Sequence, residues 1–299
     1  MSGDGLPAVG THEVEAEIYH SWDLCSASRL HVLLTRSAHR CRYLIDSPRD
    51  ATPAMSLGTA AHRAILEPDE FERRYLVAGQ CEATTGKGER CRSQGSLYVD
   101  GSWFCKVRGH ARAEPDPTDG YTIIEREWHE KALAIRDAVY RHPVAAALLK
   151  GQTRREVSMV WRDETHGLDC KGRLDILADV TLADVKVSKD AHPDRFDVFL
   201  RNSGAYRQAA FYLGGLGALG REVRDSALIL VEPDPPHEVV IRTVEEDWLR
   251  IGRAQLYRGM TLYAECLRSG KWPGYPRGIV PSDPPPQWLL RQEFPEEMQ

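Results

Sequence analysis

Two short β-type runs, residues 174–178 and 182–187, lie back to back near the middle of this 299-residue sequence. The residues between them are few enough for a hairpin-like turn. Because side chains alternate along a strand, Asp184 and Lys186 share one face, and the valines next to them point into a core. An adjacent strand brings Asp175 onto that carboxylate face. The sequence therefore predicts paired strands that carry two aspartates and a lysine together.

This set of side chains suits the hydrolysis of a phosphodiester. Two carboxylates can hold a divalent metal ion, and a lysine beside them can orient or activate a water molecule. The pattern Asp-(x)n-Asp-x-Lys is short, so on its own it is equally compatible with a half-exposed hairpin whose charged face is solvated. The rest of the chain has to decide between the two interpretations.

Four further side chains fit the same site. A strand expected over residues 155–162 puts Glu156 on the face of the aspartates, as a metal ligand or beside one, or else as a solvated strand residue. His62 lies within a helix of small and apolar residues, as a core histidine or as a metal ligand from a helix over the sheet. Gln208 and Tyr212 are four residues apart and share a helix face.

Composition limits the setting of the protein. The content of 42% hydrophobic and 28% charged residues is typical of a globular protein. The net charge of −5 gives no indication of nucleic-acid binding. A local basic track can still hold phosphates. Candidate tracks are Arg36, Arg40 and Arg42, then Arg154 and Arg155, then Arg201 and Arg207. No apolar run approaches the roughly 18 residues of a membrane span, and the N-terminus does not look like a secretory signal. We expect a cytoplasmic protein with no membrane partner.

Three of the seven cysteines cluster and point to a second metal site. The spacing from Cys81 through Cys91 and Cys105 to His110 is Cys-x9-Cys-x13-Cys-x4-His, a closed ligand set for structural Zn²⁺. The residues between them are polar and rich in glycine, so metal binding would supply the missing folding energy. The alternatives are an iron–sulfur cluster or three unrelated thiols. The odd count argues against a disulfide framework, and the other four cysteines are expected to be packed or free thiols.

The remaining pattern predicts a mixed α/β chain. It divides into an N-terminal helical part (1–79), a zinc-binding insert (80–112) and a core with a C-terminal helix and tail (113–299). Residues 1–20 look like a polar lead-in, residues 37–43 like a short basic stretch, and residues 188–203 like a loop with a helical turn. The tail from residue 270, rich in proline and tryptophan, is expected to pack as irregular structure. The other expected elements are helices at 27–36, 125–140, 144–149, 204–213 and 245–268 and strands at 155–162, 168–178, 182–187, 226–232 and 239–244.

Taken in order, the motifs resemble a known family. They are Leu57-Gly-Thr-Ala-Ala-His62, a strand with Glu156, Gly172-Arg-Leu-Asp175, Asp184-Val-Lys186 and Tyr206-Arg-Gln208-x3-Tyr212. This order resembles the RecB-like branch of the PD-(D/E)xK nucleases and, within it, the phage RecE-type exonucleases (exodeoxyribonuclease eight). The sequence is also similar to that family in three further places: residues 57–71, Ser26-x-Ser28-x-Leu30 and Trp272-Pro-Gly-Tyr275. The resemblance covers about residues 20–290, apart from the cysteine insert.

The resemblance implies a fold and a metal site. The fold is α/β (α+β), with a restriction-endonuclease-like core in which helices flank a central mixed β-sheet, and with the small zinc-binding insert added. It implies one or two Mg²⁺ or Mn²⁺ ions. The implied ligands are His62, Asp175 and Asp184, with Glu156 at or near the metal. Lys186 would position the attacking water and stabilise developing charge, and Gln208 and Tyr212 would hold the strand being cut.

The resemblance also implies a function: a metal-dependent exonuclease that acts on ends of duplex DNA in phage-type recombination, together with a single-strand annealing protein. A DNA endonuclease or repair nuclease of the same fold is a second interpretation. A catalytically inactive, zinc-dependent DNA-binding module is a third, and the presence of Asp175, Asp184 and Lys186 counts against it. Related enzymes form rings around DNA, so a homo-oligomer also stays open.

Overall fold

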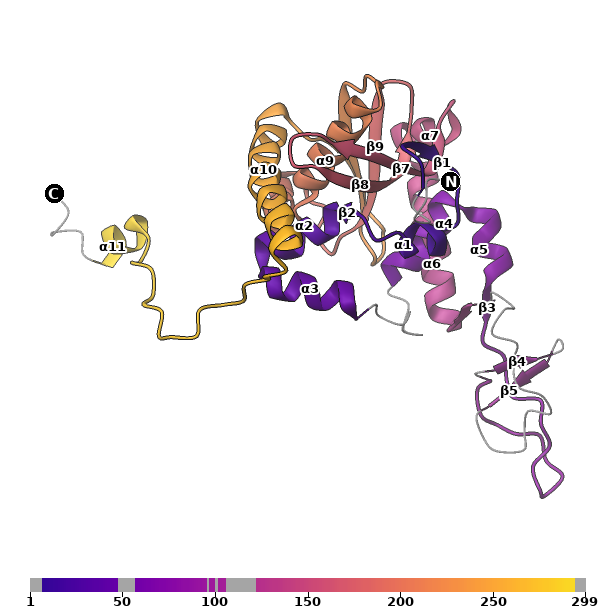
Figure 1. Cartoon of the computed structure of the whole chain (residues 1–299). Coiled ribbons are helices and arrows are strands. Elements are labelled where there is room, and N and C mark those ends of the chain that lie inside the picture. The colour runs from indigo at the N-terminus through magenta and orange to yellow at the C-terminus, as the bar shows by residue number, and fades with distance from the viewer. Residues whose placement is uncertain (1–6, 48–56, 96, 100–101, 106–121, 294–299) are drawn as a thin grey trace.

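The computed structural model describes residues 7–47, 57–95, 97–99, 102–105 and 122–293 (Figure 1). Helices flank a central mixed β-sheet, which confirms the expected fold class. Among the described residues, no helix combines the length and the apolar character needed to cross a membrane.

The central sheet has the strand order β1-β7-β8-β9-β10-β11, and β2 pairs with β8. The pairs β9–β10 and β2–β8 are parallel, and the other neighbours are antiparallel. The strands expected near the site begin and end within about one residue of their predicted positions. The strands of this sheet are β1 (Gly10–His12), β2 (Cys25–Ser26), β7 (Arg154–Asp163), β8 (Leu168–Leu177), β9 (Thr181–Val187), β10 (Asp225–Val231) and β11 (Val239–Thr243).

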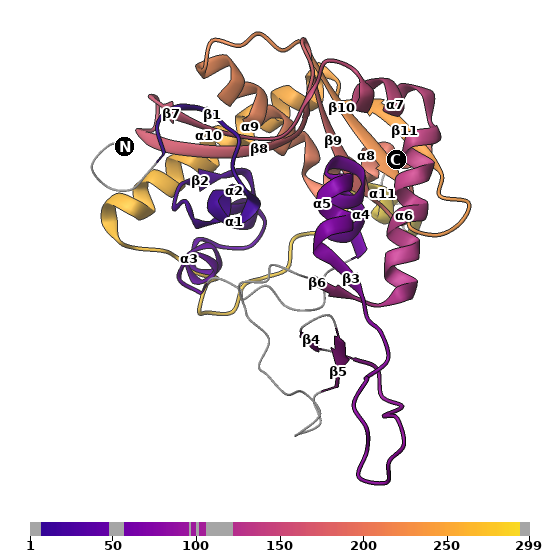
Figure 2. The same ribbon diagram turned by 90° about the vertical axis from the view of Figure 1, so that its right-hand side faces the viewer.

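Helices cover both faces of the sheet (Figure 2). On one face, α4, α6 and α7 bury Ile176, Ala183 and Val185. On the other face, α2, α9 and α10 pack against residues such as Leu174 and Leu182. The helices are α1 (Ala16–Ser21), α2 (Ala27–Thr35), α3 (Ala38–Asp46), α4 (Leu57–Leu66), α5 (Pro68–Arg74), α6 (Arg126–Arg141), α7 (Pro143–Lys150), η1 (Pro193–Arg195), α8 (Phe196–Ser203), α9 (Ala205–Ala218), α10 (Glu246–Ser269) and α11 (Gln287–Glu293).

Two segments near the N-terminus are more regular than expected. The supposed lead-in contains β1, which joins the edge of the sheet, and α1. The supposed basic stretch is α3, whose N-terminus is capped by Ser37 Oγ accepting from the backbone N–H of Arg40 at 3.1 Å. Its apolar pattern was too sparse to predict a helix, because only Ala38 and Cys41 are buried.

The C-terminal tail differs from its prediction in a different way. Only its start packs on the main body, where Pro273 O accepts from the backbone N–H of His39 at 2.9 Å, and its described part finishes with α11 (Figure 1). Ile279 is fully exposed and Trp288 is 66% exposed, so these apolar side chains have little to pack against in a single chain. The expectation assumed that proline and tryptophan residues need a core contact. Of the tail's tryptophans, Trp272 makes one, against Tyr263, and Trp288 is exposed.

The cysteine-rich segment leaves the main body between β3 (Tyr75–Val77) and β6 (Thr122–Ile124), which pair in parallel. Within it, β4 (Leu97–Val99) and β5 (Ser102–Phe104) form an antiparallel pair. Both views show the segment projecting away from the central sheet (Figures 1 and 2). The boundary at residue 112 lies outside the described residues, so the expected division at 80–112 stays a prediction.

Candidate active site

The site forms where the central sheet splits. β9 pairs with β8 only at Ile176–Ala183 and Leu177–Leu182, and β2 takes the same edge of β8 further back, at Cys170 and Lys171. Between these two pairings, none of the described strands borders residues 172–175 on that edge. Asp175 fills part of the opening, because its Oδ2 accepts a hydrogen bond from the backbone N–H of Val185 at 2.7 Å. A carboxylate therefore stands where a strand partner would be.

Both strands change face at Glu156 and Asp175, the one position at which the β7–β8 register records no pair. In β8, Leu174 packs on one face of the sheet and Ile176 on the other, although two residues apart in a regular strand share a face. In β7, Arg155 and Val157 are also two residues apart and break the same rule. Arg155 donates to Leu66 O at 3.1 Å on the α4 side, whereas Val157 packs on the opposite face.

The backbone of Glu156 shows how this change of face is made. Its φ is +53°, in the left-handed region that residues with a Cβ seldom adopt. This conformation lets Arg155 and Glu156 both point toward α4. Strained backbone of this kind tends to persist at functional sites, where the surrounding structure holds it. Glu156 is held in this way, since its Oε2 accepts from Arg173 Nε, and Arg173 also donates to Ser158 Oγ at 3.0 Å.

His62 reaches the opening from α4. The alanines of this helix, Ala60, Ala61 and Ala64, are fully buried, so the helix axis can lie close to the sheet. His62 Nε2 is 2.9 Å from Asp175 Oδ2, and its Nδ1 is 3.5 Å from Glu156 Oε1. The imidazole thus lies between the two carboxylates, as expected for a ligand donated by a helix that lies over the sheet.

The second aspartate and its partners meet the opening from β9 and α9. Lys186 Nζ is 2.6 Å from Asp184 Oδ2. Gln208 Nε2 donates to Asp184 Oδ1 at 3.1 Å and to the Tyr212 hydroxyl at 3.2 Å. Since α4 and α9 cover opposite faces of the sheet, the split lets side chains from both faces meet. The structure therefore brings together His62, Glu156, Asp175, Asp184, Lys186, Gln208 and Tyr212.

Burial and close charges perturb the titration of this cluster. Burial and the neighbouring Asp175 raise the pKa of Asp184 to about 6. Burial also acts to raise the pKa of Asp175, but His62 and Lys186 outweigh it and hold that pKa below its usual value. For His62, burial acts in the opposite direction, yet Asp175 and Glu156 raise its pKa to about 9. Strongly shifted groups that face a cavity are typical of functional sites.

A cavity of about 570 Å³ opens in front of these groups. Its basic lining residues are Arg29, Arg63, Lys171 and Arg173, together with Lys186, and the arginines of the expected tracks are not among them. The first four could not be grouped from the sequence, because they come from three separate elements, α2, α4 and β8. Of these residues, Arg173 was the easiest to predict from the sequence, because it lies within the Gly172-Arg-Leu-Asp175 motif.

The donor set of the cluster fits a divalent metal ion. Ligand atoms of His62, Glu156 and Asp175 all lie within 4.8 Å of one another, and Asp184 falls outside this group of three. Glu156 Oε1 is buried and accepts no hydrogen bond from the described residues, with His62 Nδ1 3.5 Å away, whereas Asp184 Oδ2 is met by the Lys186 ammonium. An unsatisfied buried acceptor costs about 1–3 kcal/mol, which a bound cation would offset. Carboxylate oxygens with one imidazole are ligands that suit Mg²⁺ or Mn²⁺.

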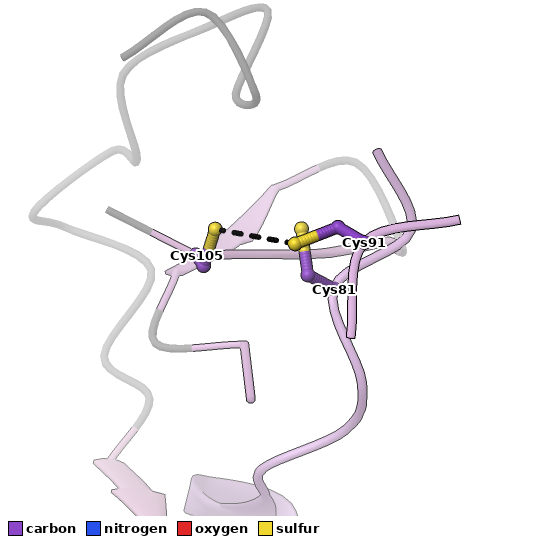
Figure 3. Close-up of side chains that lie close together, drawn as sticks. All are labelled: Cys81, Cys91 and Cys105. Carbon is purple, nitrogen blue, oxygen red and sulfur yellow. Dashed lines mark hydrogen bonds between the residues drawn. The ribbon is translucent and has the colours of Figure 1, made fainter. Parts of the chain in front are cut away.

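The cysteines of the projecting segment form a second cluster, which shares no residue with the first. Cys81, Cys91 and Cys105 are buried and converge (Figure 3). His110, the fourth ligand expected from the sequence, lies outside the described residues. The other cysteines are buried in the main body, as expected for packed thiols, and Cys25 and Cys170 are partners in the β2–β8 pair.

Fold and site together define a PD-(D/E)xK-type domain, in which acidic residues on neighbouring strands stand beside a lysine two residues after the second aspartate. Residues 19–279 match the family described as "PDDEXK-like domain of unknown function (DUF3799)", and the chain belongs to that family. The match spans most of the chain, so the fold expected from the resemblance is confirmed at this level. The narrower resemblance to RecE-type exonucleases stays a prediction.

Comparison with solved structures supports the same fold. A crystal structure named "Putative exonuclease" from Eubacterium rectale superposes with a TM-score of 0.59 and 14% sequence identity, covering 95% of this chain and 99% of that chain. At this identity the likeness shows a shared fold. The structure named SSO0001 has a TM-score of 0.25 and 17% identity over 44% of this chain and 67% of that chain. No curated protein matches the chain.

Proposed function

We propose that this protein is a nuclease that hydrolyses phosphodiester bonds of DNA with Mg²⁺ or Mn²⁺ as cofactor. The observation that carries the proposal is the convergence of Asp175, Asp184 and Lys186 with His62 and Glu156 at the split in the sheet. This set joins metal-binding oxygens, an imidazole and an ammonium group in one cavity. Membership in a PDDEXK-like family supports the same reaction class.

We assign different roles in the reaction to the residues of the cluster. His62, Glu156, Asp175 and Asp184 would hold the metal, which when bound polarises the phosphate and lowers the pKa of a water molecule. Lys186 positions the attacking water and stabilises the negative charge that develops on the phosphate. Gln208 orients the Asp184 carboxylate through its amide, and Tyr212 anchors Gln208. The basic residues of the cavity, Arg29 and Arg63 among them, supply a positive wall for the DNA backbone.

We further propose that the protein is an exonuclease and that its substrate is the end of duplex DNA. The name of the Eubacterium rectale structure supports the exonuclease class by analogy. An exonuclease of this kind leaves a single-stranded tail. Such a tail is the substrate of a single-strand annealing protein, which makes that class of protein the expected partner in recombination.

Digestion of linear and covalently closed circular duplexes with Mg²⁺ tests both levels of the proposal. We expect the linear duplex to be degraded and the circle to be spared. Cleavage of the circle would replace the exonuclease by an endonuclease of the same fold. Failure to cleave either DNA with Mg²⁺ or Mn²⁺, by a protein shown to be folded, would refute the nuclease proposal.

A further inference from the structure

The buried side chains among the described residues of the projecting segment are cysteines. Its buried cluster consists of Cys81, Cys91 and Cys105, with Ala83 and Phe104 partly buried against them. None of these residues belongs to the clusters that pack on the central sheet. A buried CH₂ group contributes about 0.8 kcal/mol, whereas ordering the backbone costs about 1–2 kcal/mol per residue. Packing of three thiols is therefore too weak to order this segment.

The separation of the sulfur atoms distinguishes between a disulfide and thiolates that share one metal ion. Cys91 Sγ lies 3.9 Å from Cys105 Sγ, and the ligand atoms of all three cysteines lie within 4.8 Å of one another (Figure 3). A disulfide has a sulfur–sulfur distance of about 2.05 Å, so no pair here is a disulfide. Tetrahedral coordination with Zn–S bonds of about 2.3 Å places neighbouring sulfurs about 3.8 Å apart. The observed spacing agrees with that of thiolates around one zinc ion.

The backbone is shaped to bring the sulfurs together. The N–H of Cys81 donates to Ser93 O at 2.9 Å, and the N–H of Cys91 donates to Ala83 O at 2.8 Å, which joins the first two cysteines across a narrow loop. The N–H of Glu82 donates to Trp103 O at 2.7 Å and draws in the strand that leads to Cys105. These bonds fix the three cysteines although they are spread over 25 residues of sequence.

Two further contacts show that this geometry is built into the segment. A Cβ atom added at Gly79 would lie 2.4 Å from Trp103 Cδ1, and one added at Gly95 would lie 2.8 Å from Trp103 Cβ, so both glycines are needed for the indole to pack.

We propose that Cys81, Cys91 and Cys105 bind one Zn²⁺ ion as thiolates, and that this ion folds the projecting segment. The sequence expects His110 in the fourth position, but that residue is outside the described part of the chain and the proposal does not rest on it. Three thiolates around a redox-inert ion give a structural role, separate from the oxygen-rich cluster that suits Mg²⁺.

Metal analysis of the purified full-length protein tests the proposal. We expect close to one zinc per chain, and a loss of most of it in the variants Cys81→Ser, Cys91→Ser and Cys105→Ser. Cys266→Ser is the matched control, since Cys266 is a buried thiol of α10, and it should keep its zinc. Growth with Co²⁺ should give the intense absorption of tetrahedral cobalt with thiolate charge-transfer bands, a readout that does not depend on variants that fold poorly.

The outcomes separate this proposal from the nuclease proposal. Asp184→Asn, which removes a carboxylate of the other cluster, should keep its zinc whatever its activity. Wild-type protein without zinc, or with iron and the visible absorption of an iron–sulfur cluster, would overturn the zinc assignment. Equal loss of zinc from the Cys266→Ser control would also overturn the assignment to these three cysteines. Neither result would affect the proposal for Asp175, Asp184 and Lys186.

Discussion

Lys186 and Asp184 are the residues on which the proposed chemistry depends most directly. The Lys186 ammonium lies 2.6 Å from Asp184 Oδ2 and lines the same cavity as His62 and Asp175. We expect Lys186→Ala to lower kcat by about 10²–10³-fold, the usual loss when one stabilising group is removed from a transition state. Asp184→Asn should lower it at least as far. The measurement is Mg²⁺-dependent degradation of end-labelled linear duplex.

Asp169→Asn is the matched control for these two variants. Asp169 lies on β8 like Asp175, but its carboxylate is 45% exposed and is paired with Arg162 away from the cavity. This variant should retain wild-type activity. Wild-type rates in Lys186→Ala and Asp184→Asn would show that the cluster is a structural ion-pair network.

His62 should make stability depend on pH in protein without Mg²⁺. Its pKa is raised from 6.5 to about 9, so folding favours the protonated ring, and the stabilisation is full below pH 6.5 and is lost as pH rises through about 9. The low pKa of Asp175 keeps its carboxylate ionised across this range. We expect His62→Gln to lower the free energy of unfolding by ~1–2 kcal/mol below pH 6.5, after allowance for partial exposure of the ring. Urea titrations of both proteins should show that difference shrinking above pH 9, and a constant difference would contradict the assignment.

At this scale, the sequence was informative wherever residue type and spacing together indicate chemistry. Asp175, Asp184 and Lys186 stand in a short pattern, and the structure brings them together. Lys171 could not be predicted in the same way. Its ammonium donates to Tyr19 O at 2.8 Å and to Trp22 O at 2.6 Å, which fixes the end of α1 beside the cavity. That role depends on a pairing between distant segments, and no local pattern records such a pairing.

Among the elements, β7 carries a local strain that can be measured. Glu156 has a φ of +53°, which costs a residue with a Cβ about 1–2 kcal/mol and costs glycine little. Glu156→Ala and Glu156→Gly both remove the carboxylate and differ mainly in this term. We therefore expect Glu156→Gly to unfold at higher denaturant than Glu156→Ala, by about 1 kcal/mol, while both lose activity. If the alanine variant is the more stable of the two, the left-handed backbone is not a source of strain.

The strands that carry the site were largely predictable, and the two features of them that were missed have one cause. The alternation of Val157, Met159 and Trp161 placed β7 correctly, and all three pack on one face of the sheet. Alternation cannot reveal where a strand changes face, because that change depends on the opposite strand. The same limit explains the split between β8 and β9, which hydrophobic periodicity does not encode. The sequence thus predicted which strands carry the carboxylates but not the opening that brings them together with His62.

Helix α9 and strand β8 depend on a close approach at Gly172. A Cβ added there would lie 2.9 Å from Tyr212 Cε1 and 2.8 Å from Met159 Cε, so Gly172→Ala must displace the ring that anchors Gln208. We expect a destabilisation of about 1–3 kcal/mol, typical of overpacking, together with reduced activity. Gly217→Ala is the control on α9, where an added Cβ meets nothing within 4 Å, and it should be neutral or stabilising. Equal behaviour of the two variants in thermal unfolding and activity assays would contradict this account.

For the whole molecule, the central question is whether the two clusters depend on one another. The oxygen-rich cluster lies inside the main body, where α4 and α9 meet the split sheet. The cysteines lie in a segment that leaves and rejoins this body at β3 and β6, with the N–H of Ala78 donating to Ile124 O at 2.9 Å. Their buried cores have no residue in common. The molecule therefore consists of a main domain with its own hydrophobic core and a projecting segment that is stabilised separately.

This arrangement predicts that the projecting segment can be removed without unfolding the main domain. We expect a chain in which residues 79–120 are replaced by a Gly-Ser linker of about six residues to fold, since such a linker spans roughly 13 Å and allows the parallel β3–β6 pair to form. It should degrade linear duplex with Mg²⁺ and contain no zinc. Mg²⁺ should still raise its melting temperature, because a ligand that binds only the folded state stabilises it. Adding Asp184→Asn to this shortened chain should weaken both effects of Mg²⁺. A shortened chain that unfolds cooperatively, like the parent, yet no longer degrades DNA would show that the segment contributes to the substrate site, and the two clusters would then belong to one functional unit.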